Sequence, residues 1–151
     1  MSHRYVFRSE WHIAATSDDV YAALADVEAY PQWWHQVRTA RRVDDRSGEL
    51  TCRSLLPYDL TFVIERVIED AEQRVLRGRL TGDLNGESQW SVSADAAGSV
   101  AVFDEDVTVG KGLLRAAGLL VRPALKFNHR LMMRSGEAGL RKHLEPLDGG
   151  L

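Results

Sequence analysis

Hydrophobic and polar residues alternate along the first segment of the chain, from Arg4 to Ile13. One side of this segment carries Tyr5, Phe7 and Trp11, and the residues between them are mostly charged or polar. Alternation with a period of two is typical of a β-strand that buries one face. We therefore expect the chain to open with a half-buried strand.

A helical pattern follows this strand. The stretch DDVYAALADVEAY places apolar residues on one face at helical spacing, and Thr16 or Ser17 stands in position to cap its amino end. Pro31 interrupts the pattern, and the residues around it predict a second short helix over Glu28 to His35. Two short helices are thus expected before the next strand.

Further strand-like runs fill the middle of the chain. They are Val37–Val43, Leu50–Leu56, Leu60–Ile68, Arg74–Leu84, Ser88–Ala94 and Ser99–Val109. The connections DDRSG, LPYD, EDAEQ, LNGE and DAAG are rich in Asp, Asn, Gly and Pro, which is typical of hairpin turns. Strands joined by hairpins are antiparallel neighbours, so the chain predicts one antiparallel sheet of seven strands that curves strongly.

The last pattern is a long amphipathic helix from Arg122 to Leu144, with Asn128 near the middle of its apolar face. The other residues of that face are Val121, Ala124, Leu125, Leu131, Met132, Ser135, Gly136 and Gly139. A face with so many small residues indicates either a hollow beside the helix or very close backbone packing. This helix is the element long enough to cover the concave face of the sheet.

The glycine- and leucine-rich segment before this helix allows three interpretations. Pro123 suits the first turn of a helix and is disfavoured inside one. Residues 110–122 are therefore a lid, a kinked extension of the helix or a segment that docks to a partner.

Composition fits a single domain over residues 1–151. A net charge of −3 gives no general attraction to nucleic acid, and no apolar run is long enough for stable membrane insertion. We expect no signal peptide, because charge is scattered through the amino-terminal residues, and Cys52, the lone cysteine, can form no disulfide within the chain. We expect a cytoplasmic protein, either a monomer or a homodimer.

Two sequence signatures, ATSDDVYAALADVEAYPQWW and FNHRLMMRSGEAGL, together with the order of elements, resemble one known superfamily. It is the START-like, birch-pollen-allergen-like superfamily, also called SRPBCC, and the similarity is to its polyketide cyclase/dehydrase branch. The second signature is similar to a narrower bacterial group. The resemblance implies a helix-grip fold of the α+β class, in which the curved sheet wraps the long C-terminal helix and encloses a cavity for an apolar molecule. Members include aromatase/cyclases, lipid carriers and hormone receptors, so the fold does not by itself decide the function.

The cavity implied by this resemblance makes several residues candidates for ligand contact. Asn128 is the strongest, because a buried amide in an apolar stripe needs partners, either from a ligand or from nearby backbone. The others, each of which can equally be a core residue, are Trp33, Trp34, Phe62, Trp90, Phe103 and Met132. Cys52 is interpreted as a small strand residue.

Three residues are weaker candidates for acid–base chemistry. Glu105 falls on the apolar face of the last strand, where a carboxylate is costly unless it is paired or wet. Arg66 falls on the more apolar side of its strand, where it can meet Glu105, bind a ligand anion or extend to solvent. His129 projects to the edge of the apolar stripe of the long helix, and we expect it to be half-exposed.

No nucleophile triad, zinc motif or nucleotide-binding loop is present in the sequence, so neither a metal nor a cofactor is predicted. The leading hypothesis is a protein that binds a hydrophobic small molecule, aromatic or polyketide- or lipid-like, in an internal cavity. One alternative is a polyketide cyclase or dehydratase that uses acid–base residues there. The other is a co-chaperone-like module that binds proteins.

Overall fold

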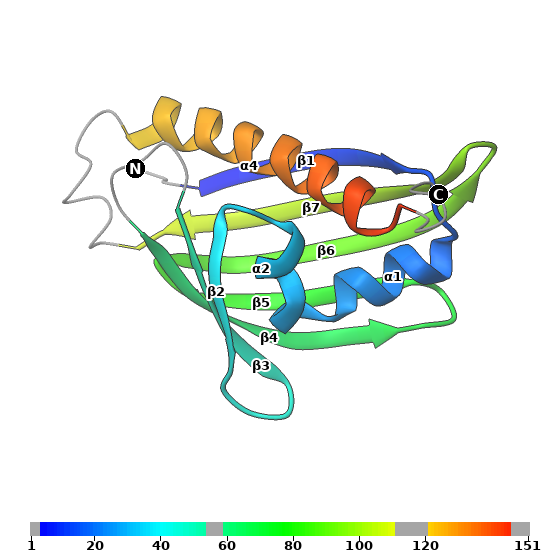
Figure 1. Ribbon diagram of the computed structural model, residues 1–151. Coiled ribbons are helices and arrows are strands. Elements are labelled where there is room, and N and C mark those ends of the chain that lie inside the picture. The colour runs from blue at the N-terminus through cyan, green and yellow to red at the C-terminus, as the bar shows by residue number, and fades with distance from the viewer. Residues whose placement is uncertain (1–3, 54–58, 111–120, 146–151) are drawn as a thin grey trace.

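The computed structural model describes residues 4–53, 59–110 and 121–145. The segment 111–120, on which the three interpretations depend, and most of the predicted LPYD turn lie outside these residues. A curved sheet forms one layer, and the helices lie against its concave face (Figure 1). The strands are β1 Arg4–Ile13, β2 Val37–Arg42, β3 Ser47–Cys52, β4 Leu60–Asp70, β5 Val75–Gly82, β6 Leu84–Asp95 and β7 Gly98–Val109. The helices are α1 Ser17–Ala25, the 3-10 turn η1 Val27–Ala29, α2 Tyr30–Trp33 and α4 Val121–His143.

The sheet has seven strands in the order β1-β7-β6-β5-β4-β3-β2, and every adjacent pair is antiparallel. Each strand from β2 to β7 lies beside its neighbour in sequence, as the hairpin signals predict. The first strand closes onto the last, with Phe7 opposite Glu105. The predicted helix-grip architecture is confirmed.

Local capping signals account for the helices that follow β1. Thr16 caps α1 by accepting a hydrogen bond from the amide of Asp19 at 3.2 Å. The predicted second helix from Glu28 to His35 is shorter in the structure, because the turn η1 comes first and α2 spans four residues. Pro31 lies in the first turn of α2, where its missing amide leaves no hydrogen bond unmade.

One predicted turn is wrong. The LNGE stretch is part of β6, and the chain reverses earlier, at Gly82 and Asp83. Asn85 closes this corner, since its side chain accepts a hydrogen bond from the Gly82 amide at 3.1 Å and donates one to the Gly82 carbonyl at 2.9 Å. Gly86 is needed for close approach within the sheet, because a Cβ there would overlap the carbonyl oxygen of Asp106.

The long helix α4 packs against β1 and α2. Its bounds agree with the predicted helix to within one residue at each end. The helix α1 packs against β6 and β7, at the end of the sheet where α4 finishes (Figure 1). No helix among residues 4–53, 59–110 and 121–145 is long and apolar enough to cross a membrane.

Candidate functional site

A pocket of about 300 Å³ lies between the concave face of the sheet and the first half of α4. Its volume is at the lower end of the range for small-molecule sites. Most of its wall is apolar, including Phe62, Ile64, Leu80, Trp90, Phe103 and Val107. These side chains come from the inward-facing positions of β4, β5, β6 and β7, so the period-two pattern of the strands builds the wall.

The small residues of α4 serve close packing in the second half of the helix. A Cβ on Gly136 would lie 2.6 Å from ring atoms of both Trp11 and Trp34. A Cβ on Gly139 would overlap the carbonyl oxygen of Trp33. Of the two explanations that the sequence left open, close backbone packing therefore applies to this half of the helix.

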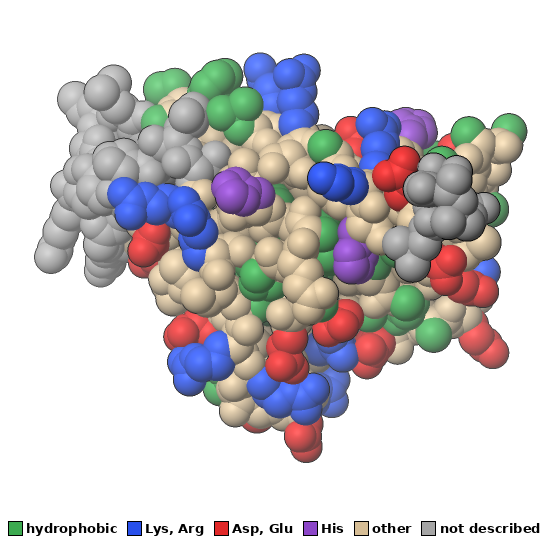
Figure 2. Space-filling model, viewed as in Figure 1, with side chains coloured by type: hydrophobic (Ala, Val, Ile, Leu, Met, Phe, Trp, Pro, Cys, Tyr) green, Lys and Arg blue, Asp and Glu red, His purple; other side chains and the backbone are tan. Residues whose placement is uncertain are grey.

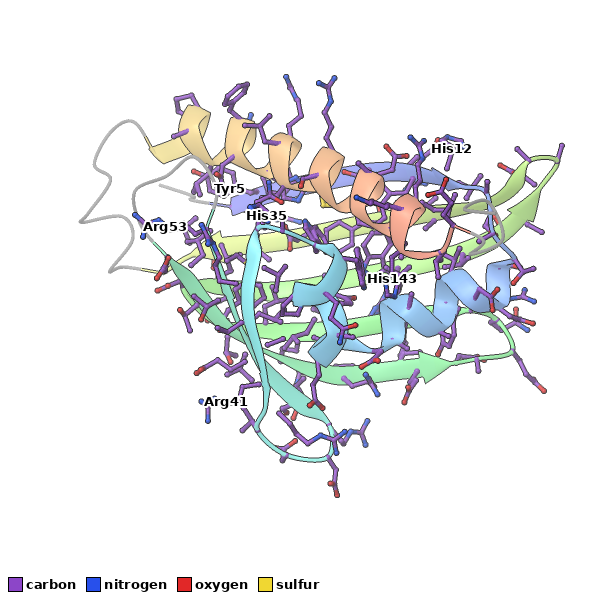
Figure 3. All side chains as sticks on the ribbon, viewed as in Figure 1. Tyr5, His12, His35, Arg41, Arg53 and His143 are labelled. Atoms are coloured by element: carbon purple, nitrogen blue, oxygen red, sulfur yellow. The ribbon has the colours of Figure 1, made fainter. Side chains whose placement is uncertain are left out.

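The first half of α4 faces the pocket instead. Its lining residues are Leu125, Asn128, His129, Met132 and Met133. Tyr5 of β1 lies below this half of the helix and also borders the pocket (Figure 3). The hollow and the close packing are thus both present, one after the other along the same helix face.

Glu105 and His129 meet inside the pocket. The carboxylate oxygen Oε1 of Glu105 lies 3.3 Å from Nε2 of His129, and the two side chains are 9% and 18% exposed. That separation is an ion-pair distance, yet Nε2 makes no hydrogen bond of good geometry within the described part of the chain. His129 is therefore more buried than its place at the edge of the helical stripe suggests.

Aromatic rings hold the imidazole of His129 in place. The ring of Phe7 stacks on it with centroids 3.8 Å apart and planes 9° from parallel. Phe103 lies on β7 with its ring centroid 6.2 Å from that of the imidazole. The histidine is consequently fixed by packing from two neighbouring strands.

Asn128 is buried, with 3% of its surface exposed, and lines the pocket. Its amide Nδ2 lies 3.8 Å from the sulfur of Met132, one turn further along α4. Both predicted ligand-contact residues on this helix thus border the same space.

The predicted tryptophans divide between the pocket and the core behind it. Trp34 and Trp90 line the pocket, whereas Trp33 is not part of its wall. Trp33 packs against Trp34 with centroids 5.6 Å apart and against Trp11 at 6.3 Å. Of the two adjacent tryptophans, Trp33 is the anchor between helix and sheet. His35, beside them, is exposed and labelled in Figure 3.

Arg66 lines the pocket but does not meet Glu105. Its guanidinium donates to Glu69 at 2.9 Å and to the carbonyl oxygen of Ala25 at 2.7 Å. Glu105 has His129 as its ionisable neighbour instead, at the other side of the sheet. The suggested contact between Arg66 and Glu105 is therefore wrong, because Arg66 is drawn toward the end of α1.

Charged side chains surround the pocket at the β2–β3 hairpin. Lysine or arginine side chains and acidic ones gather next to each other over this hairpin (Figure 2). Those that line the pocket include Arg41, Arg42, Asp44, Asp45 and Arg46. The site is thus apolar inside and charged at this rim.

Sequence reasoning missed Cys52 as a pocket residue. Its buried thiol lines the pocket, and burial, followed by the charge of Glu105, raises its pKa to about 12. The thiol therefore stays protonated at neutral pH and acts as an apolar wall group. Cys52 lies two residues after Leu50 on β3, so both side chains point to the inner face of the sheet. This spacing was the signal that could have identified Cys52.

Within the described ranges, no three His, Cys, Asp or Glu residues come close enough to hold a metal ion. The polar side chains in the pocket wall include the carboxylate of Glu105, the imidazole of His129 and the amide of Asn128.

Comparisons with known proteins agree with this architecture. A family model described as polyketide cyclase / dehydrase and lipid transport matches residues 4–145. The fold is similar to that of the Zhui aromatase/cyclase from Streptomyces sp. R1128, at 18% identity and a TM-score of 0.82, over 99% of this chain and 100% of that one. A protein from Thermus thermophilus is 19% identical with a TM-score of 0.72, over 93% and 100% of the two chains. A START superfamily protein from Mycobacterium smegmatis is 16% identical with a TM-score of 0.69, over 94% and 97%. No curated protein matches the chain.

Proposed function

Because the chain belongs to the polyketide cyclase / dehydrase and lipid transport family, we propose that it binds a hydrophobic small molecule, aromatic or polyketide-like, between α4 and the sheet. The observation that carries this proposal is the pocket of about 300 Å³ with its mostly apolar wall. Binding is favourable when an apolar ligand replaces water in an apolar pocket of this size. The compartment that we propose is the cytoplasm, where the thiol of Cys52 would stay reduced.

The wall favours flat rings over flexible chains. Trp90 lies 4.7 Å from Phe103 between ring centroids, and both rings border the pocket together with Trp34. Aromatic rings interact well with other aromatic rings in stacked or edge-to-face arrangements. A rigid ligand also loses less conformational entropy on binding than a flexible chain does.

The first experiment is native mass spectrometry of the protein purified gently from its own host, with extraction and identification of any additional mass. A discrete bound molecule supports the proposal and names the chemistry. Thermal unfolding with an aromatic panel then measures binding, since a ligand at 100 times its Kd adds about 2.7 kcal/mol of stability. An apo mass together with no shift from any member of the panel contradicts the proposal.

A matched pair of variants on β6 connects binding to the pocket. Ser88 is buried and lines the pocket, whereas Ser93 is exposed on the other face of the same strand. Ser88→Leu fills part of the space and should weaken binding tenfold or more, while Ser93→Leu should leave it unchanged. Equal affinities in the two variants would show that the ligand binds elsewhere.

The Glu105–His129 pair supports a second candidate function, a polyketide cyclase or dehydratase. Cyclisation of a poly-β-ketone requires a base that takes a proton from a methylene between two carbonyls. The resulting enolate attacks a ketone carbon, and an acid protonates the alkoxide that forms there. Dehydration then requires an acid that protonates the departing hydroxyl, which leaves as water, and a base that takes the neighbouring C–H proton as the double bond forms. A buried carboxylate 3.3 Å from an imidazole can supply both roles.

The assay for this second function is turnover of a poly-β-ketone substrate, followed by product analysis. Glu105→Gln and His129→Phe should each lower kcat at least a hundredfold, the usual contribution of a general acid or base. Glu87→Gln makes the same substitution at an exposed position of β6 and should retain full turnover. Unchanged kcat in both pocket variants would reject this mechanism.

A further inference from the structure

Glu105 and His129 bring two polar groups together at the wall of the pocket. Nε2 is shielded from solvent and makes no hydrogen bond within the described residues, although Glu105 Oε1 lies 3.3 Å away. Buried polar atoms in proteins are nearly always hydrogen-bonded, and an exception at the wall of a pocket points to water or a ligand group. A polar ligand group at this wall therefore lies close to both residues.

The two side chains are held in fixed positions before any ligand arrives. The imidazole is stacked on Phe7 at 3.8 Å. Glu105 stands on β7 with Phe7 opposite it on β1 and Ser88 opposite it on β6. A site whose groups are already in position loses little free energy to reorganisation on binding.

A hydroxyl group fits both partners at once. It can donate its proton to the carboxylate of Glu105 and accept a hydrogen bond from an imidazole N–H of His129. A ligand carboxylate has no proton to donate and would place a second negative charge beside Glu105. Like charges repel strongly where water is excluded.

The arginines that line the pocket have other partners in the protein, and three of them are paired with carboxylates, so they compensate little for that repulsion. These hydrogen bonds, within the described residues, are Arg41 to Glu49, Arg42 to Glu28, Arg46 to the carbonyl of Arg66, Arg66 to Glu69, and Arg77 to Gln89. In addition, three of these arginines belong to the charged rim at the β2–β3 hairpin.

We infer that Glu105 and His129 select a neutral hydroxyl on the ligand, of the phenol or enol type, and exclude ligands that carry a carboxylate at that position. This inference rests on the proposed binding function and identifies the ligand class for the same pocket. The aromatic side chains of the pocket bind the rings of the ligand, and Glu105 and His129 discriminate between ligands by the polar group that those rings carry.

Three naphthalenes of nearly equal shape test the selection by isothermal titration calorimetry. They are 2-naphthol, 2-methylnaphthalene and 2-naphthoate, measured with the unmodified protein, Glu105→Gln and the exposed control Glu87→Gln. In Glu105→Gln the affinity for 2-naphthol should fall about tenfold, because a hydrogen bond to a charged group becomes one to a neutral group. The affinity for 2-naphthoate should rise about tenfold, because the repulsion is removed.

The methyl compound serves as the internal control for the pocket. Its affinity should change less than twofold in Glu105→Gln, and Glu87→Gln should match the unmodified protein with all three ligands. His129→Phe keeps a ring beside Phe7 and removes the imidazole nitrogens. It should therefore also lose affinity for 2-naphthol, while its affinity for 2-methylnaphthalene stays the same. This second variant provides the test if Glu105→Gln does not fold.

The outcomes distinguish the selection of a hydroxyl from the binding function itself. Opposite changes for 2-naphthol and 2-naphthoate support the selection of a hydroxyl. Binding of all three compounds with no response to either pocket variant overturns that selection and leaves the binding function standing. Failure of the unmodified protein to bind any of the three overturns both.

Discussion

The indole nitrogen of Trp34 donates a hydrogen bond of 2.9 Å to the main-chain carbonyl oxygen of Met132. This bond joins the end of α2 to the middle of α4. It also marks the change along α4 from the half that borders the pocket to the half that packs through glycine. The position of the pocket therefore depends on how closely the second half of α4 approaches α2 and β1.

Substitution of the two helix glycines by alanine should destabilise the protein. Alanine normally improves an exposed helix position by about 1 kcal/mol over glycine, but here its methyl group has no space. We expect Gly136→Ala to cost about 1–3 kcal/mol, because two tryptophan rings must move. Gly139→Ala should cost more, because its methyl group meets the main chain of Trp33. Urea unfolding measures both effects.

Arg134→Ala is the control for this pair, since Arg134 is exposed on the same helix. It should leave the free energy of unfolding within about 0.5 kcal/mol of the original value. Stabilisation by either glycine substitution would contradict the close packing.

A second contact holds α4 to the edge of the sheet. Glu137 accepts a hydrogen bond of 2.9 Å from the main-chain amide of His12, and Arg141 donates one of 2.8 Å to the carbonyl oxygen of His12. Glu137→Ala should lower the free energy of unfolding by about 1–2 kcal/mol. It should also speed hydrogen exchange at the His12 amide. Lys142→Ala, at an exposed position of the same turn, should change neither quantity.

Cys52 should make stability depend on pH in the alkaline range. Burial raises the pKa of its thiol from 9.0 to about 12, so the unfolded chain loses this proton before the folded protein does. The contribution of the thiol to stability is complete below pH 9 and is lost as the pH rises toward 12. In that range the thiol should make the free energy of unfolding fall by up to about 1.4 kcal/mol for each unit of pH.

Cys52→Ala should flatten that slope above pH 9, even though it lowers stability at neutral pH by leaving space in the wall. Burial also raises the pKa of the Tyr30 phenol, so Tyr30 lowers stability at high pH in the same way. Its effect is the same in the original protein and in Cys52→Ala, so it cancels in the comparison of the two slopes. Identical slopes in the two proteins would show that the thiol is not desolvated.

The Glu105–His129 pair should show strong energetic coupling in the ligand-free protein. His129→Phe leaves the buried carboxylate of Glu105 without its imidazole neighbour, and we expect a loss of about 1–3 kcal/mol. Adding Glu105→Leu should recover most of that loss, because an apolar pair can replace a buried ionisable pair at little cost. A double-mutant cycle measures the coupling, and additive effects of the two substitutions would mean that the residues do not interact.

Much of the fold was predictable because its signals are local. The alternation from Arg4 to Ile13 and the turns at EDAEQ and DAAG depend on near neighbours in the chain, and they recur in the structure. The prediction of a turn at LNGE was wrong because Asn85 and Gly86 have other roles. Asn85 hydrogen-bonds to Gly82, and Gly86 lets β6 approach β7 closely, and local composition reveals neither contact.

The candidate site was only partly predictable, because its contacts join residues far apart in the chain. Parity correctly placed Glu105, Trp90 and Phe103 on the inner face of the sheet. It did not show that Glu105 would meet His129, or that Arg66 would turn to Glu69 and Ala25. These pairings depend on the angle at which α4 and α1 cross the sheet.

The sequence by itself determined the order of the elements, the antiparallel pairing from β2 to β7 and the face to which most strand residues point. Those properties follow from backbone periodicity and turn chemistry, which act over a few residues. The tertiary structure alone decided which part of the small-residue face of α4 is closely packed and which part borders a pocket. That division arises because Gly136 and Gly139 let the backbone of α4 approach Trp33 and Trp34, while Leu125 and His129 remain over the open part of the sheet.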